Sequence, residues 1–213
     1  MRFQSFIHLL LIIGLTYAAY LLLLLSAPYL ALKPNVEFLL TKQLIYHVKL
    51  WRISFYVHVF SSVTLVVAGL FQFSRYILKK YTMIHRISGF IYLITVLLIS
   101  GPAALVMSFY ANGGIPAQIS FVLLSGIWLC CTFTAWRFLR KKEYERHGNW
   151  MLRSYALTLS AVTLRLYAYL FDVWKVDLNP IDTYILLAWM SWIPNLMIAE
   201  LMIRKGFVKR IIH

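Results

Sequence analysis

Among the ionisable side chains within, or at the ends of, the long apolar stretches of this 213-residue sequence, four are candidates for chemistry: His58, His85, His147 and Arg165. Ionisable groups are costly in hydrocarbon, and those that occur there usually face the interior of a helix bundle and mark functional sites. Imidazole nitrogens bind haem iron and other metals, and guanidinium groups pair with carboxylates and phosphates. The sequence therefore indicates a binding or redox site inside a membrane.

The first pair of candidates is His85 and His147, which stand at the starts of two apolar segments that run in the same direction. In an up-and-down bundle these segments are the third and fifth helices, which sit diagonally and place both imidazoles at the same depth. Two histidines so placed can ligate one haem iron from opposite faces. Arg86 and Arg153 lie close in sequence and suit the haem propionates. Our leading hypothesis is that the protein binds a b-type haem between His85 and His147 and uses it for electron transfer.

Other interpretations of these two histidines remain open. Both can be interfacial residues that meet lipid headgroups or loop backbone, or ligands of zinc, copper or a quinone-type molecule. A structural zinc site requires four ligands. The faces that carry His85 and His147 offer no Cys or acidic ligand, apart from Glu143 and Glu145 on the adjoining loop. Haem is therefore favoured over zinc.

A second pair of candidates follows from two polar stripes at helical spacing. One stripe contains His147, Met151, Ser154, Thr158, Ala161, Arg165, Ala168 and Asp172; the other contains His58, Ser61, Ser62, Leu65, Ala68, Gly69 and Gln72. His58 lies about 10 Å from the outer end of its helix, at roughly the depth of Arg165. The two line a common site if their helices face each other, whereas an Arg165–Asp172 ion pair is the competing interpretation. Such a site suits a small molecule or a lipid.

The elements that position these residues are predicted from hydropathy. Hydrophobic residues make up 62% of the chain and charged residues 13%, against about half and a quarter in a soluble domain. Six apolar segments each approach the roughly 20 residues needed to span a bilayer: Phe6–Ser26, Trp51–Ser74, Ile84–Phe109, Gln118–Leu139, Trp150–Phe171 and Ile181–Ile203. We predict an all-α, polytopic protein with one transmembrane domain, residues 1–213, and an up-and-down core of helices two to five.

Charge predicts the orientation and the partners. The net charge is +14, and the basic residues cluster beside the ends of the apolar segments. By the positive-inside rule, we expect a multi-pass protein of the inner membrane with both termini in the cytosol. The first outer loop, with Lys33, Lys42, Lys49 and Arg52, is the exception, but the count over short loops still favours this orientation. Lipid headgroups are the expected partners, and the lack of a basic domain outside the membrane excludes nucleic acid. The longest outer loop, residues 27–50, is amphipathic enough in its second half for a surface helix.

Three runs of residues resemble a family of bacterial membrane proteins known only as a domain of unknown function. They are Gln72-Phe73-Ser74-Arg75, His85-Arg86-Ile87-Ser88-Gly89 and His147-Gly148-Asn149-Trp150-Met151-Leu152-Arg153-Ser154-Tyr155-Ala156-Leu157, accompanied by His58, Tyr92 and Thr163-Leu164-Arg165. The resemblance covers helices two to five and brings no established activity. A fainter similarity connects the chain to four-helix membrane b-type cytochromes, which hold haem between histidine pairs on diagonal helices. Only His85 and His147 match such a pair, because helix four has no histidine to partner His58.

Motifs of common enzyme classes are missing from the sequence. It contains no P-loop, dinucleotide fingerprint, HExxH motif or recognisable Ser/His/Asp arrangement. A non-catalytic accessory subunit of a larger membrane complex is therefore the main alternative to haem binding, and short loops and seven tryptophans fit it.

Overall fold

The computed structural model is helical throughout the residues it describes, 2–73 and 75–212, with side chains described from residue 13 onward. Six helical segments within this part are long and apolar enough to cross a membrane, which confirms the all-α polytopic prediction. They are α1 (Arg2–Ser26), α2 (Lys49–Leu70), α4 to α5 (Thr82–Ile94 and Gly101–Ser108, joined by a π-helical turn), α6 (Gly114–Arg140), α7 to α8 (Tyr144–Thr158 and Ser160–Val173), and α9 to α10 (Pro180–Met190 and Ile193–Arg204).

Shorter helices occupy the connections between these segments: η1 (Ala27–Ala31) and η2 (Glu37–Lys42) after α1, α3 (Arg75–Lys80) after α2, and α11 (Phe207–Ile212) after α10. The second apolar segment was predicted to extend to Ser74, which lies outside the described residues, and α2 ends at Leu70. We name the two ends of the bundle by one residue each. The Lys42 end holds the connections 27–48, 109–113 and 174–179, and the His147 end is opposite.

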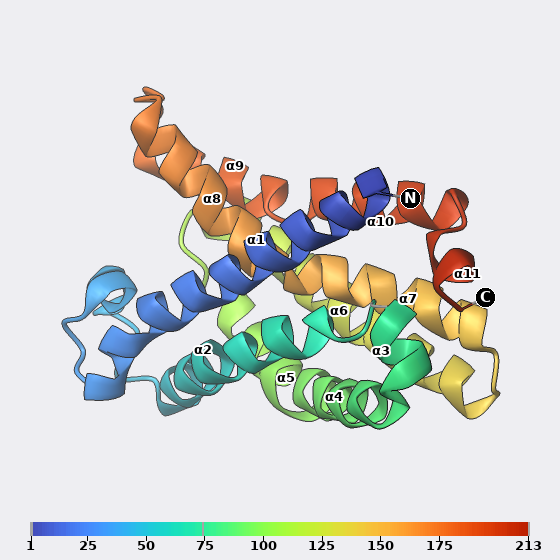
Figure 1. Ribbon diagram of the computed structural model, residues 1–213. Coiled ribbons are helices and arrows are strands. Elements are labelled where there is room, and N and C mark those ends of the chain that lie inside the picture. Colours follow the sequence, from blue (N-terminus) through green and yellow to red (C-terminus); the bar gives the residue numbers. More distant parts are fainter. Residues whose placement is uncertain (1, 74, 213) are drawn as a thin grey trace.

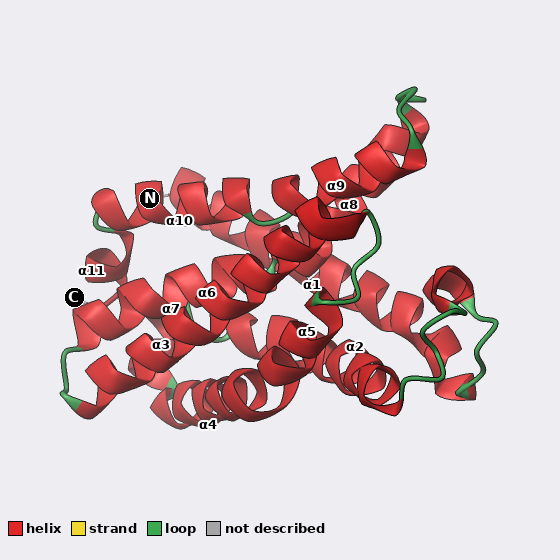
Figure 2. Cartoon of the chain, turned by 180° about the vertical axis from the view of Figure 1, so that it is seen from behind, coloured by secondary structure: helices red, strands yellow, loops and turns green. Residues whose placement is uncertain are grey.

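Helices two to five form the predicted up-and-down bundle. α2 packs against α4 and α5, these pack against α6, α6 packs against α7, and α7 returns to α2. The third membrane segment, α4 to α5, and the fifth, which begins with α7, therefore lie diagonally across the bundle. α1 packs on the outside of α2, while α9 and α10 pack against α6 and α7 (Figures 1 and 2).

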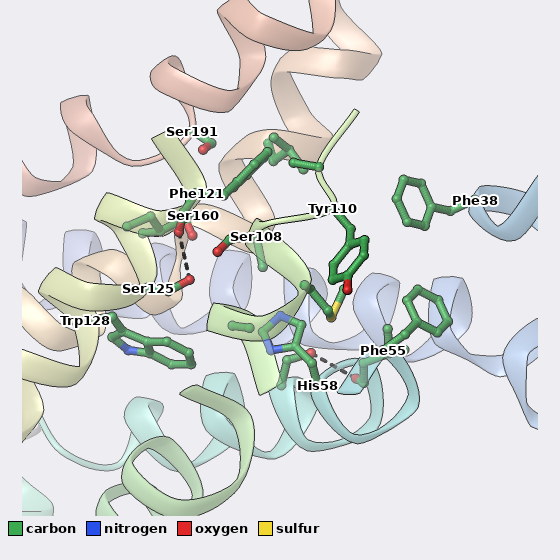
Figure 3. A pocket seen from close by; sticks show the side chains of 18 of the residues that line it. Phe38, Phe55, His58, Ser108, Tyr110, Phe121, Ser125, Trp128, Ser160 and Ser191 are labelled. Carbon is green, nitrogen blue, oxygen red and sulfur yellow. Dashed lines mark hydrogen bonds between the residues drawn. The ribbon is translucent and has the colours of Figure 1, made fainter. Parts of the chain in front are cut away.

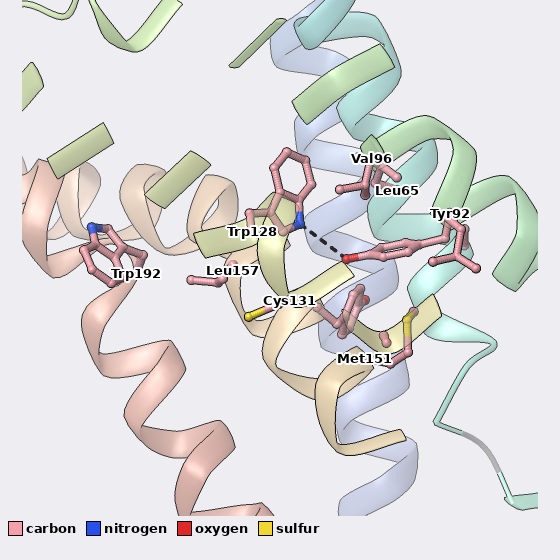
Figure 4. Packing of buried hydrophobic residues seen from close by; sticks show 12 residues of the cluster. Leu65, Tyr92, Val96, Trp128, Cys131, Met151, Leu157 and Trp192 are labelled. Atoms are coloured by element: carbon pink, nitrogen blue, oxygen red, sulfur yellow. Dashed lines mark hydrogen bonds between the residues drawn. The ribbon is translucent and has the colours of Figure 1, made fainter. Parts of the chain in front are cut away.

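A network of hydroxyl groups joins three of these helices at the centre of the bundle. The fully buried Tyr92 hydroxyl on α4 lies 2.8 Å from Ser154 Oγ and 2.7 Å from Thr158 Oγ1, both on α7. Trp128 Nε1 on α6 donates to Thr158 Oγ1 at 3.1 Å and points toward Tyr92 (Figure 4). Because lipid tails are as apolar as the core, hydrogen bonds and close packing hold transmembrane helices together. The network therefore fixes how α4, α6 and α7 meet.

The fifth membrane segment is interrupted just beyond this network. α7 ends at Thr158, Leu159 forms a turn, and α8 begins at Ser160. α7 packs extensively on α6, whereas α8 packs against α9 and rises with it away from the bundle (Figure 1). α8 thus separates from α6, while Ala19 and Leu22 of α1 pack with Val66 of α2 in a cluster that Val162 of α8 also contacts.

α2 packs tightly against Tyr155 of α7 at Gly69. A Cβ atom added there would lie 1.8 Å from a ring carbon of Tyr155. This ring cannot move aside easily, because it is 5% exposed and its hydroxyl donates to the carbonyl oxygen of Val66 at 3.1 Å. A side chain at position 69 therefore has to push α2 and α7 apart.

We predict that Gly69→Ala destabilises the protein by about 1–3 kcal/mol, the usual range for overpacking. Gly126→Ala on α6 is the matched control, since nothing lies within 4 Å of a Cβ added there and alanine favours the helix. Thermal unfolding of the purified protein in detergent, followed by circular dichroism, measures both. Equal transition temperatures for the two variants would contradict the close contact at Gly69.

Candidate functional site

A cavity of about 330 Å³ lies toward the Lys42 end of the bundle, in the space left where α8 departs from α6. Its walls come from α2, α5, α6 and α8, with further residues from α7 and α9, and η1 and η2 contribute Tyr29, Phe38 and Lys42 (Figure 3). The residues of helix two and helix five that were predicted to share a site, His58 and Arg165, both line it.

Most of the cavity wall is aromatic or aliphatic. Phe55 stacks on Trp51 at 5.5 Å and on Phe38 at 6.1 Å between ring centroids, and Trp51 and Phe55 are almost fully buried. Leu65 and Trp128 form the deep end, next to the hydroxyl network of Tyr92. Apolar walls with a few polar groups are typical of sites for small organic ligands.

His58 is the polar group on the helix-two side of the cavity. Its Nδ1 lies 3.0 Å from Ser100 Oγ and 3.2 Å from the Ser100 carbonyl oxygen, in the π-helical turn of helix three. These contacts hold the ring in place and leave Nε2 as the nitrogen available to a ligand. Which nitrogen carries the proton depends on the direction of the Ser100 bonds.

Arg165 is the polar group on the helix-five side. Its Nη1 donates to the Ala161 carbonyl oxygen one turn earlier, at 2.7 Å. Within the described part of the chain it forms no ion pair with Asp172 or any other acid, so the competing interpretation of this residue is wrong. A guanidinium carries five N–H donors, and most of those on Arg165 remain available.

Lys42 is the second cation among the cavity residues, beside Arg165, and the sequence analysis did not identify it as a site residue. It is 4% exposed, and its Nζ donates to the carbonyl oxygen of Tyr110 and, at 2.5 Å, to Asn112 Oδ1. Its Nζ also lies 5.6 Å from the centre of the Phe38 ring. Burial lowers the pKa of Lys42 to about 8. The sequence contained one indication that Lys42 could belong to a site. This lysine follows the apolar run Phe38-Leu39-Leu40, and such a pattern predicts an amphipathic turn whose lysine can face the protein interior.

The proposed haem ligands lie at the other end of the bundle, on diagonal helices as predicted. His85 stands on α4 and His147 on α7, and His147 Nδ1 lies 2.9 Å from the Ala135 carbonyl oxygen. His85 Nδ1 is buried and has no hydrogen-bond partner among the described residues. Neither residue lines the 330 Å³ cavity, nor a smaller one of about 240 Å³ between α7 and α10. The described residues form no cluster of three or more potential metal ligands.

The other predicted site residues at this end have protein partners or face outward. Arg153 forms a two-point ion pair with Glu200, at 2.5 Å and 3.0 Å, and stacks 4.5 Å over the Trp150 ring. Gln72 donates to Ser88 Oγ at 2.7 Å and to the His85 carbonyl oxygen at 3.2 Å, which joins helices two and three. Arg86 is exposed.

Comparison with known proteins gives a family and no assigned activity. Residues 55–203 match the family model described as "Predicted membrane protein (DUF2306)". No curated protein and no solved structure matches the chain significantly. The matched range covers the four-helix bundle, most of the residues around the cavity and both haem-candidate histidines. The chain therefore belongs to this family of membrane proteins of unknown function.

Proposed function

We propose that the protein binds an amphiphilic small molecule or lipid in the cavity between helices two and five. The observation that carries the proposal is the combination of aromatic walls with His58 and Arg165, whose free nitrogens line one space. The walls accept an apolar chain, and the two nitrogen-bearing groups orient a polar head. The volume of about 330 Å³ falls within the roughly 300–1,000 Å³ usual for ligand pockets.

The orientation of the protein belongs to the same proposal. Basic residues cluster at the His147 end, in the connections 74–81 and 141–143 and in the tail after Arg204. The positive-inside rule places this end in the cytosol of an inner-membrane protein. The cavity then lies in the outer half of the bilayer, where an amphiphile from the outer leaflet reaches it without crossing the membrane.

A photoactivatable probe tests whether the cavity is occupied. The protein is reconstituted in nanodiscs with an amphiphile that carries a diazirine in its alkyl chain, irradiated, and mapped by peptide mass spectrometry. We expect labelling of the cavity segments around Phe55–Leu65 and Trp128. Ala161→Phe fills the cavity from α8 and is expected to reduce this labelling about tenfold or more, because the site buries most of its ligand.

Ala168→Phe is the matched control for this experiment, since Ala168 lies two turns further along α8, is exposed and does not line the cavity. It should leave the labelling unchanged. Labelling confined to lipid-facing residues such as Leu98 and Phe90, with no difference between the two variants, would reject the proposal.

We propose haem binding by His85 and His147 as a second function, on a separate observation. The buried Nδ1 atom of His85 has no partner among the described residues, and the Ala135 carbonyl occupies Nδ1 of His147, so Nε2 of His147 is free to bind iron. A bound haem would supply one-electron redox chemistry. Because Glu200 engages Arg153, Arg86 is the remaining arginine for a propionate.

An absorption spectrum tests this second function. We expect protein expressed with ample haem to show a Soret band, with sharp α and β bands after reduction by dithionite. His85→Ala and His147→Ala should each abolish these bands, whereas His47→Ala, at an exposed loop histidine, should preserve them. A flat visible spectrum from folded protein would exclude haem and leave the amphiphile site unaffected.

A further inference from the structure

We infer that the head group of the ligand is an anion, a phosphate or a carboxylate, bound jointly by Arg165 and Lys42. The inference rests on the proposed function and specifies its ligand class. It follows from the charges around the cavity, from their hydrogen bonds, and from the presence of both cations among the residues that line this one cavity.

The cavity contains positive charge without negative charge. The ionisable side chains that line it are Tyr29, Lys42, His58, Tyr110, Arg165 and Tyr184, and no aspartate or glutamate is among the lining residues. The described residues contain two ion pairs, Arg146–Glu143 and Arg153–Glu200, and both lie outside the cavity. The protein itself therefore provides no counter-ion for Arg165 or Lys42.

The hydrogen-bond partners of the Lys42 ammonium group are neutral acceptors. Its Nζ donates to the Tyr110 carbonyl oxygen and to the Asn112 amide oxygen, and the Phe38 ring lies nearby. Charges removed from water are costly to the fold unless an opposite charge compensates them. An anion in the cavity would supply this compensation.

Arg165 also has no acidic partner among the described residues, and its side chain is exposed, in contrast to the buried Lys42. Its one hydrogen bond in the described structure stays within its own helix turn, and the remaining donors include those suited to two-point binding of phosphate or carboxylate. Arginine in a membrane segment usually pairs with an acid or with backbone carbonyl groups. Arg165 has the Ala161 carbonyl as a partner but no acid among the described residues. The break at Leu159 lets α8 carry Arg165 along the cavity.

The walls decide between an amphiphile and a free anion. Inorganic phosphate needs donors on most sides, whereas here most of the wall is apolar and includes Trp51, Phe55 and Trp128. These residues fit an alkyl or isoprenoid chain. The occupant we infer is therefore a single-chain amphiphile with an anionic head.

Two diazirine probes with the same hexadecyl chain test the inference, one ending in phosphate and one in uncharged glycerol ether. In nanodiscs of zwitterionic lipid, we expect the phosphate probe to label the cavity segments more strongly. Arg165→Gln and Lys42→Met should each reduce phosphate-probe labelling about tenfold or more, because each removes a charge-assisted hydrogen bond. Arg52→Gln is the charge-matched control, since Arg52 stacks over Tyr46 and does not line the cavity.

The pH dependence separates Lys42 from the other groups. The pKa of Lys42 is about 8, so its ammonium is charged at pH 7 and an anion is attracted; deprotonation at higher pH removes the attraction. Labelling by the phosphate probe should therefore fall between pH 7 and pH 10, with a midpoint above 8 because the bound anion favours the charged form. Lys42→Arg should keep its labelling over this range, while the cavity tyrosines, His58 and Arg165 are the same in both proteins.

Each outcome has a distinct meaning. Equal cavity labelling by both probes would overturn the anionic head group and leave the proposed function standing, whereas labelling by neither probe would overturn the proposed function as well. Loss of phosphate-probe labelling under excess inorganic phosphate would identify a free-anion site and reject the amphiphile. If a variant loses its thermal transition, the comparison of the two probes on the unaltered protein decides alone.

Discussion

The buried hydroxyl of Tyr92 is the contact on which the arrangement of the bundle depends. Ser154 and Thr158 stand one turn apart on α7. The Tyr92 hydroxyl can reach both of them only at one register of α4 against α7. Trp128 and Thr132 bring helix four into the same network. In an apolar interior a missing partner leaves a polar group unsatisfied, so the network penalises any slip of these helices.

The network also determines where the cavity begins. Thr158 is the last residue of α7, and the chain turns at Leu159 before α8 departs toward α9. Trp128 belongs to both regions, since its Nε1 donates to Thr158 and its ring lines the deep end of the cavity. The part of helix five held by hydrogen bonds stays on α6, and the part beyond them forms a wall of the cavity. A ligand that moves the Trp128 ring therefore acts on the same hydrogen bonds that hold the bundle together.

Sequence patterns were sufficient for the architecture and for part of the site. Segment length and hydropathy predicted six spanning helices, and residue depth predicted that His58 and Arg165 share a site. The break at Leu159 carries no proline or glycine and was not predictable, because tertiary contacts rather than local propensity place it. Glu200 has Arg204 one turn away, yet it pairs with Arg153 on α7, where two hydrogen bonds replace one exposed helical pair. Lys42 was missed because its partners, Tyr110 and Asn112, are about seventy residues away.

The two ends of the bundle differ in how their polar groups are satisfied. At the His147 end, most of them have protein partners. His147 hydrogen-bonds to the Ala135 carbonyl, Arg153 forms an ion pair with Glu200, and Gln72 donates to Ser88. His85 Nδ1 is the buried exception. At the Lys42 end, two cations share one cavity and neither has an acidic partner. Because uncompensated charge is most costly where water is scarce, the stronger requirement for an external partner lies at the Lys42 end. A cofactor at His85 would give a partner to one nitrogen atom, whereas an anion that binds both Lys42 and Arg165 would neutralise two charges.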